Sequence, residues 1–139
     1  GRGQIEMMEQ SIHQLASQEY VRLSKDTRIS QAITSMTDAE ASEAYVISND
    51  NCFLGKVSLH GLLTKSDTKM VMSALMQNPT RIKHDASLQQ GIEIASEFVG
   101  ESIPVINLET DEMLGVLSEA DLFQAYLATQ SKIIDLEKE

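Results

Sequence analysis

Aromatic residues and cysteine are scarce in this chain of 139 residues. It has no tryptophan, and aromatic residues make up 4% of the sequence, so we expect a core of aliphatic residues and methionine. The single cysteine, Cys52, excludes an intrachain disulfide and fits a reducing cytoplasm. No apolar run approaches the roughly 20 residues of a membrane-spanning helix. The first residues also lack the charged-then-apolar pattern of a signal peptide.

Positive charge is also in short supply. The chain has 11 Lys and Arg residues against 21 Asp and Glu residues, which gives a formal net charge of −10. Such a surface repels phosphate backbones and anionic lipids, so we expect no nucleic-acid partner and no direct membrane insertion. An anionic small ligand would need a local basic or dipolar site.

The residue types that bind metals or perform catalysis do not occur at the spacings typical of metal sites or active sites. His13, His60 and His84 do not share the spacing of metal ligands, and Cys52 has no nearby cysteine, so no metal site is expected. The sequence contains no recognisable nucleophile–base pair or pair of catalytic carboxylates. We therefore expect a protein that is not an enzyme.

The sequence does contain an internal repeat with a period of about sixty residues. The matches are Arg22 with Arg81, Asp26 with Asp85, Gln31 with Gln90, and Ile33 with Ile92. Segment 44–47 then matches 103–106, and segment 54–58 matches 114–118 after a one-residue insertion. We place the boundary between residues 66 and 67: residues 1–66 hold the first repeat with an N-terminal helix, and residues 67–139 hold the second with a C-terminal helical extension.

Each repeat predicts the element order β-α-β-β-α. Strands are expected at 20–23, 45–48 and 52–58, and again at 80–83, 104–107 and 113–118, with polar turns between the last two of each set. Apolar residues spaced by three and four indicate helices near 29–36 and 88–99. Closing helices are expected at 59–63 and 119–129, and extra helices at 5–17 and 69–76. The predicted fold is therefore α+β, with two repeats that share a core through an approximate two-fold axis.

The repeats resemble the cystathionine-β-synthase-type (CBS) domain family, and the tandem resembles a Bateman module. The resemblance is carried by segment 102–106 (Ser-Ile-Pro-Val-Ile), by the glycine of segment 113–117, and by segment 118–122 (Ser-Glu-Ala-Asp-Leu). It spans about residues 5–130. It implies a homodimeric regulatory module that senses AMP, ADP, ATP or a related adenosyl ligand, with no obligatory cofactor.

The resemblance also implies a nucleotide site. In the family, a Ser-x-x-Asp segment after the third strand faces the first strand and the pre-strand segment of the other repeat. Ser118 and Asp121 would then face Tyr20, Val21, Arg22, Ala41, Ser42 and Ala44. A carboxylate can accept hydrogen bonds from both ribose hydroxyls, and a helix start supplies free amides for phosphate. Ser118 and Asp121 are equally suited to capping a helix, and one role does not exclude the other.

The first repeat departs from this pattern. Gly61 stands where the second repeat has Asp121, so a second site built from 80–82, 100–103, Ser58 and Gly61 should be weak or empty. Acidic residues near the first site, Glu40 and Glu43, disfavour ATP and favour a nucleoside, AMP or S-adenosylmethionine. The opposing hypothesis is a ligand-free dimerisation and interaction module.

The wider setting is also an expectation. Residues 1–6 resemble the segment that joins bacterial ClC chloride channels or transporters to their CBS pair, and the chain begins without Met. We therefore expect the cytoplasmic regulatory part of an inner-membrane ion transport protein that biases gating. Another transporter or a metabolic enzyme is the alternative parent. Apolar faces at 29–36, 88–99 and 122–127 should not all be covered within one chain, which favours a homodimer.

Overall fold

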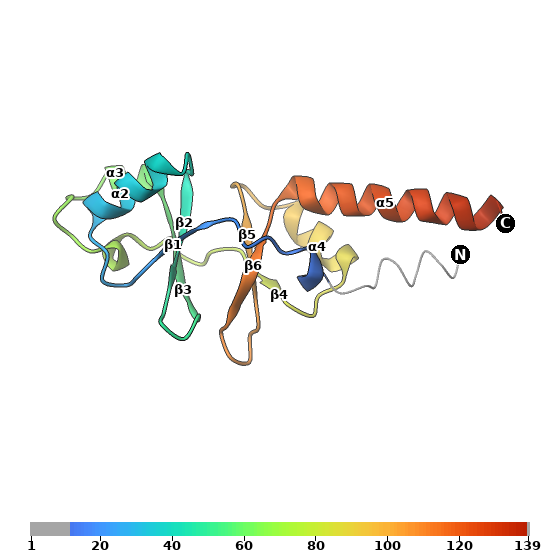
Figure 1. The fold of residues 1–139 in the computed structure, drawn as a ribbon, viewed down its shortest axis with the longest axis horizontal. Coiled ribbons are helices and arrows are strands. Elements are labelled where there is room, and N and C mark those ends of the chain that lie inside the picture. The colour runs from blue at the N-terminus through green and yellow to red at the C-terminus, as the bar shows by residue number, and fades with distance from the viewer. Residues whose placement is uncertain (1–11, 139) are drawn as a thin grey trace.

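A computed structural model describes residues 12–138 of the chain, as two sheets with helices at both outer ends (Figure 1). The elements in order are η1 (His13–Leu15), β1 (Val21–Leu23), α2 (Ile29–Asp38), β2 (Glu43–Ile47), β3 (Phe53–Ser58), α3 (Leu59–Leu63), η2 (Val71–Ala74), β4 (Ile82–Lys83), α4 (Leu88–Ala95), β5 (Ile103–Ile106), β6 (Met113–Leu117) and α5 (Glu119–Lys138). The expected β-α-β-β-α order is therefore present twice.

The two sheets repeat the same pairing. In the order β1-β2-β3, the first pair is parallel and the second antiparallel, and β4-β5-β6 does the same. The register also agrees, because Tyr45 pairs with Lys56 where Pro104 pairs with Val116. An irregularity follows Val46 in one sheet and Val105 in the other. The α+β fold with two pseudo-symmetric repeats is confirmed, and so is the alignment of the repeats.

Each repeat has its own aliphatic core between its sheet and its helices. Helix α2 buries Ile29, Ala32 and Met36 against the first sheet, as its apolar spacing predicts. Helix α4 begins at a capping box in which the Ser87 hydroxyl accepts from the Gln90 amide and the Gln90 side chain accepts from the Ser87 amide. These local signals explain why both helices begin where the sequence places them.

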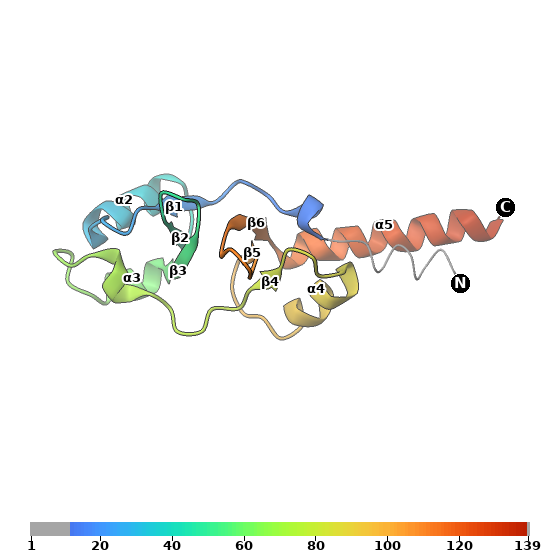
Figure 2. The same ribbon diagram turned by 90° about the horizontal axis from the view of Figure 1, so that it is seen from below.

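A third cluster joins the two sheets. Tyr45 of β2 packs with Met113 and Val116 of β6, all three nearly inaccessible to solvent. The hairpin tips are also joined, because the Phe53 amide donates to the Asp111 carbonyl oxygen. The repeats therefore form one body, with the sheets facing each other (Figures 1 and 2).

The segment before each repeat packs on the other repeat. Ile12, beside η1, is fully buried in the core of the second repeat, and Ser17 bridges to Val116 of β6. Val71 of η2 is fully buried in the core of the first repeat, and the Met76 amide donates to the Lys56 carbonyl oxygen. Figure 2 shows the two crossing segments, blue and yellow-green, on opposite sides of the sheet pair. The boundary expected between residues 66 and 67 separates the repeats along the sequence. In the packed structure, residues on each side of this boundary belong to the core of the other repeat.

Two expectations about helices need correction. The helix expected at 69–76 is the short 3-10 helix η2, and of the helix expected at 5–17 the described part is η1; residues 1–11 lie outside the described residues. The apolar face at 29–36 is covered within the chain, since Ile29, Ala32 and Met36 are buried. Exposed apolar side chains remain at Val99, Phe123 and Leu127.

Candidate functional site

A cleft of about 670 Å³ lies between the two repeats, and we call it the inter-repeat cleft. Its lining comes from β1 and the segment before it, from the end of α2 through β2, and from the segment before β5, β6 and the start of α5. The residues are Ser17, Glu19, Tyr20, Val21, Ala39, Ala41, Glu43, Tyr45, Glu101, Ser102, Val116, Ser118 and Asp121. Five of the residues predicted from the sequence therefore meet here: Tyr20, Val21, Ala41, Ser118 and Asp121.

Ser118 and Asp121 hold each other at the start of α5. The Asp121 amide donates to Ser118 Oγ at 3.0 Å, and the Ser118 amide donates to Asp121 Oδ2 at 3.0 Å. This reciprocal pair is a capping box, so the helix-capping interpretation of the motif is correct. Both side chains also line the cleft, and the capping contact fixes the direction in which the carboxylate points.

Two tyrosines form an aromatic wall of the cleft. The Tyr20 and Tyr45 rings meet edge to face, with centroids 5.5 Å apart. The Tyr20 hydroxyl is buried and has no hydrogen-bond partner among the described residues. Burial raises the pKa of Tyr20, an effect that the nearby Arg22 opposes. Burial also raises the pKa of Tyr45 strongly, so both phenols are neutral hydrogen-bonding groups at physiological pH.

Three of the predicted site residues do not line the cleft. Arg22 stacks over the Tyr20 ring at 4.7 Å and donates to Gln18 Oε1, and it borders a separate, smaller pocket. Ala44 is fully buried in the core of the first repeat, and Ser42 is exposed. Strand alternation could have separated Val21 from Arg22, since neighbouring residues of a strand face opposite ways.

The sequence reasoning missed a buried ionic network beside the cleft. Glu43 Oε1 lies 3.1 Å from Lys56 Nζ, and the two side chains are 10% and 2% exposed. The same oxygen accepts from the amides of Glu101 and Ser102 at 3.0 and 3.1 Å. Lys56 Nζ donates to the Ser102 carbonyl oxygen at 2.7 Å. The network joins the first repeat to the loop that precedes β5.

Tyr45 extends this network. Its hydroxyl lies 2.6 Å from Ser102 Oγ and 3.1 Å from the Ser102 carbonyl oxygen. Glu43, Tyr45 and Ser102 all line the cleft, so the network forms part of its wall. The Glu43 charge, which the sequence presented as an obstacle to an anionic ligand, is balanced by Lys56.

The remaining charge of the cleft is acidic. Besides Glu43, which Lys56 balances, its described lining contains three carboxylates, from Glu19, Glu101 and Asp121, and no Lys or Arg. A ligand that carries several phosphates would meet repulsion here. Weakly charged or cationic groups suit the cleft better.

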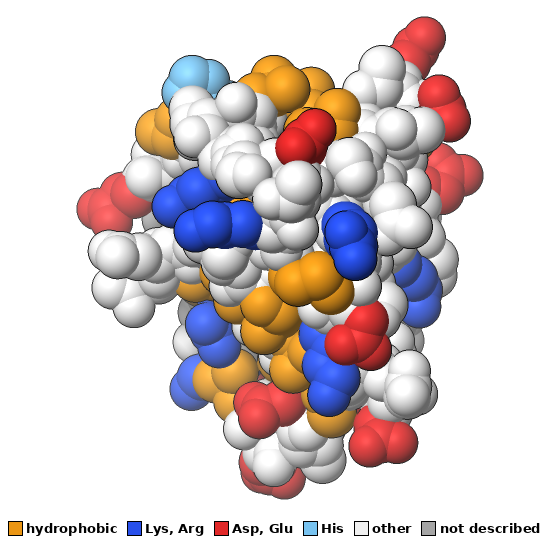
Figure 3. All heavy atoms as spheres, turned by 90° about the vertical axis from the view of Figure 1, so that its left-hand side faces the viewer, with side chains coloured by type: hydrophobic (Ala, Val, Ile, Leu, Met, Phe, Trp, Pro, Cys, Tyr) orange, Lys and Arg blue, Asp and Glu red, His pale blue; other side chains and the backbone are white. Residues whose placement is uncertain are grey.

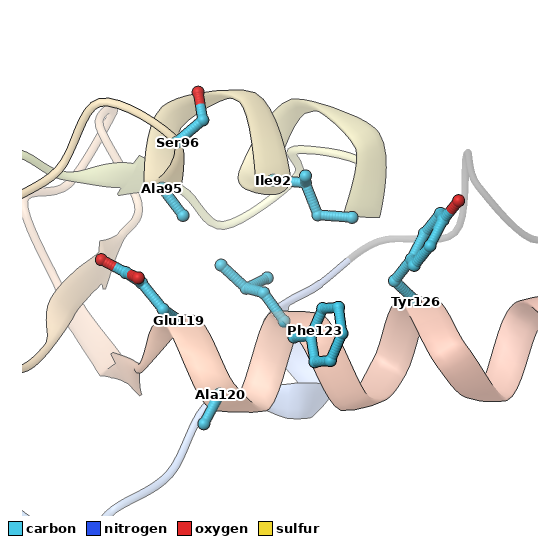
Figure 4. Close-up of a pocket in the computed structure, with 8 residues that line it drawn as sticks. Ile92, Ala95, Ser96, Glu119, Ala120, Phe123 and Tyr126 are labelled. Carbon is cyan, nitrogen blue, oxygen red and sulfur yellow. The ribbon is translucent and has the colours of Figure 1, made fainter.

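A second hollow lies between α4 and α5, and its volume is about 510 Å³. Figure 4 shows Ile92 and Ala95 of α4 pointing toward α5, which contributes Phe123 and Tyr126. Phe123 is 60% exposed although it is aromatic.

At the opposite end of the molecule, near α2 and α3, hydrophobic side chains also lie exposed among Lys and Arg side chains (Figure 3).

Among residues 12–131, whose side chains the structure describes, no group of three His, Cys, Asp or Glu side chains is arranged to hold a metal ion. Nor is any described helix long and apolar enough to cross a membrane.

No protein-family model matches this sequence, and no curated protein matches it. The comparison with solved structures does give matches. The CBS-pair domain of a candidate Mg²⁺ transporter from Shewanella oneidensis MR-1 superposes with a TM-score of 0.79, is 16% identical, and covers 91% of this chain and 78% of that one. The chain has the fold of a CBS-domain pair.

Two other solved structures share this fold. CBSX2, solved in complex with AMP, gives a TM-score of 0.72 at 16% identity over 86% of this chain and 98% of that one. The soluble part of a magnesium transporter gives a TM-score of 0.73 at 15% identity over 99% of this chain and 52% of that one. At such identities the likeness concerns the fold alone. The function of this chain has to be inferred from its own residues.

Proposed function

We propose that this CBS pair is a regulatory module that binds one adenine nucleotide or related adenosyl ligand in the inter-repeat cleft. The observation that carries the proposal is the Ser118–Asp121 pair, fixed at the start of α5 and facing Tyr20 across a cleft of about 670 Å³. A volume of that size falls within the range of small-molecule sites. The fold of a CBS pair solved with AMP supports the same ligand class.

Each part of an adenosine ligand has a counterpart in the cleft. Asp121 would accept the ribose hydroxyls, because a carboxylate can accept from two donors at once. Tyr20, Val21 and Ala41 offer an apolar and aromatic surface for the base. Tyr20 and Asp121, both predicted from the sequence, are therefore proposed binding residues.

The cleft favours a ligand with little negative charge. Without a Lys or Arg in its described lining, it offers phosphate only the amides at the start of α5. We infer the order of preference AMP, adenosine or S-adenosylmethionine over ATP. The ligand-free interaction module is the rival hypothesis.

The proposed output is the gating of an attached membrane ion transport protein at the cytoplasmic face. Solved neighbours from magnesium transport proteins support a transporter, whereas residues 1–6, which lie outside the described residues, resemble the ClC linker. We propose the ClC chloride type, with another transporter or a metabolic enzyme as alternatives. The reading frame around this segment tests the assignment, because a frame without membrane spans would contradict it.

The proposed partner is a second copy of the chain. The α4–α5 hollow and the exposed Phe123 and Leu127 offer an apolar face to it. A closed two-fold pair would cover this face on both copies. A ligand that prefers one arrangement of the repeats would shift the helices at such an interface and so bias gating.

Thermal unfolding with and without AMP tests ligand binding. A ligand at a hundred times its dissociation constant adds about 2.7 kcal/mol to the free energy of unfolding. We expect a concentration-dependent rise in Tm with AMP. No shift with AMP, adenosine or S-adenosylmethionine would favour the ligand-free module.

A further inference from the structure

Pseudo-symmetry defines a second inter-repeat site, bounded by 80–82, 100–103, Ser58 and Gly61. The matched registers of the two sheets make Lys56 the counterpart of Val116. The repeat alignment likewise makes Phe98 the counterpart of Ala39, and Gly100 that of Ala41. In the inter-repeat cleft, Val116, Ala39 and Ala41 are small residues that line open space. Two of their counterparts, Lys56 and Phe98, are far larger.

The Lys56 ammonium contacts polar and aromatic groups of both repeats. Nζ donates to the Ser102 carbonyl oxygen at 2.7 Å and pairs with Glu43 Oε1 at 3.1 Å. It lies 5.0 Å from the centre of the Phe98 ring and 5.6 Å from that of the Tyr45 ring. A carboxylate, a carbonyl oxygen and two aromatic faces form the environment that recognises a primary ammonium ion.

The loop before β5 packs against the Lys56 and Glu43 side chains. Gly100 has a φ of +151°, which favours glycine, and a Cβ placed there would lie 2.5 Å from Phe98 Cζ and 2.9 Å from Glu43 Oε2. The Phe98 ring and the Glu43 carboxylate therefore press against the glycine backbone. Lys56 is only 2% exposed, so solvent has almost no access to its side chain.

We propose that Lys56 is an internal ligand: its side chain occupies the second inter-repeat site, which is an alkylammonium site, so that each chain keeps a single nucleotide site. From the sequence, the second site is expected to be weak or empty because Gly61 replaces the aspartate. In this proposal the side chains of Lys56 and Phe98 also occupy the site, whichever residue stands at position 61. Only the number of nucleotides bound per chain rests on the proposed function. The ammonium site stands on its own contacts.

Chemical rescue tests the ammonium site. Lys56→Ala removes atoms that correspond to n-propylammonium, so this ion should bind the variant and raise its Tm in a saturable way. At tenfold excess over its dissociation constant the rise should be about 5 °C. The unmodified chain and Lys56→Met, which fills the space without the charge, should not respond beyond sodium chloride at equal concentration. Equal shifts in all three proteins, or no shift in Lys56→Ala, would overturn the proposal.

If Lys56→Ala does not fold, nuclear magnetic resonance on the unmodified chain gives the answer. The aromatic rings should move the ε-methylene protons of Lys56 upfield of those of the exposed Lys25 and Lys65, and Phe98→Leu should reduce that shift. Lys56 signals that coincide with those of the exposed lysines would overturn the proposal.

Titration with AMP separates the two proposals. One AMP per chain is expected for the unmodified chain and also for Gly61→Asp, because Lys56 and Phe98 still fill the second site. Two AMP per Gly61→Asp chain would overturn the internal-ligand proposal. An absence of any AMP binding would overturn the proposed function while leaving the propylammonium result to stand.

Discussion

The Asp121 carboxylate accepts a hydrogen bond from the Ser118 amide at 3.0 Å, and the Ser118 hydroxyl accepts one from the Asp121 amide at the same distance. The pair therefore caps α5 and presents a carboxylate to the inter-repeat cleft in one structure. The first repeat keeps half of this arrangement, since Ser58 Oγ accepts from the Gly61 amide at 2.9 Å. The serine cap is therefore present in the first repeat without a carboxylate. Capping the helix does not require the aspartate, whereas the proposed ribose contact does.

Asp121→Ala should weaken AMP binding on the order of ten- to a hundredfold, because a hydrogen bond to a charged group is lost. Calorimetry measures the affinity. Glu119→Ala is the matched control, since it removes a carboxylate from the same first turn of α5 but lines the α4–α5 hollow instead of the cleft. Equal losses in both variants would assign the effect to the helix start and not to the Asp121 carboxylate.

ATP should bind at least about tenfold more weakly than AMP, because its added phosphates meet a cleft without described cations. Glu101→Gln should narrow this difference by removing one carboxylate from the lining, and so should added salt. Glu109→Gln, in the β5–β6 turn, is the control with the same charge change away from the cleft. Tighter binding of ATP than of AMP would show that the acidic lining does not govern the choice.

Glu43 and Lys56 should be strongly coupled in stability. Replacing one partner of a buried ion pair leaves an uncompensated charge, so Lys56→Met should lower the free energy of unfolding by about 3–5 kcal/mol. Glu43→Gln combined with Lys56→Met should cost less than the sum of the two single changes. Urea denaturation gives the values, with the exposed Lys83→Met expected to stay within about 0.5 kcal/mol of the unmodified chain. Additive effects within about 0.5 kcal/mol would contradict the coupling.

Phe123→Glu should prevent self-association through the α4–α5 face, because a charge would be buried in an apolar interface. Light scattering should give twice the 15.4 kDa chain mass for the unmodified chain and the single mass for the variant. Leu108→Glu, at an exposed leucine in the β5–β6 turn, should remain dimeric. A single-chain mass for the unmodified protein at micromolar concentration would remove the homodimer.

The fold was predictable because its signals are local and occur twice. Apolar spacing predicted α2 and α4, and the alignment of the repeats predicted that Tyr45 and Pro104 occupy equivalent positions in the two sheets. The Ser118–Asp121 pair was predictable for the same reason, because its residues lie three positions apart at a helix start.

The ionic network was not predictable, because its contacts connect residues far apart in the sequence. A lysine in a strand usually indicates a solvent-facing position. Lys56 is instead buried, and its ammonium donates to the Ser102 carbonyl oxygen of the other repeat. Burial of Ile12 in the second repeat likewise depends on tertiary packing that no local pattern encodes. Arg22 was assigned to the cleft from the family resemblance, against the alternation of its own strand.

Calorimetric titration of the unmodified chain with AMP tests nucleotide binding in the inter-repeat cleft most directly, because it measures affinity and stoichiometry together. We predict saturable heat with one AMP per chain, abolished or strongly reduced by Asp121→Ala and retained in Glu119→Ala. Absence of heat, with no change in Tm at the highest AMP concentration, would contradict the proposed function.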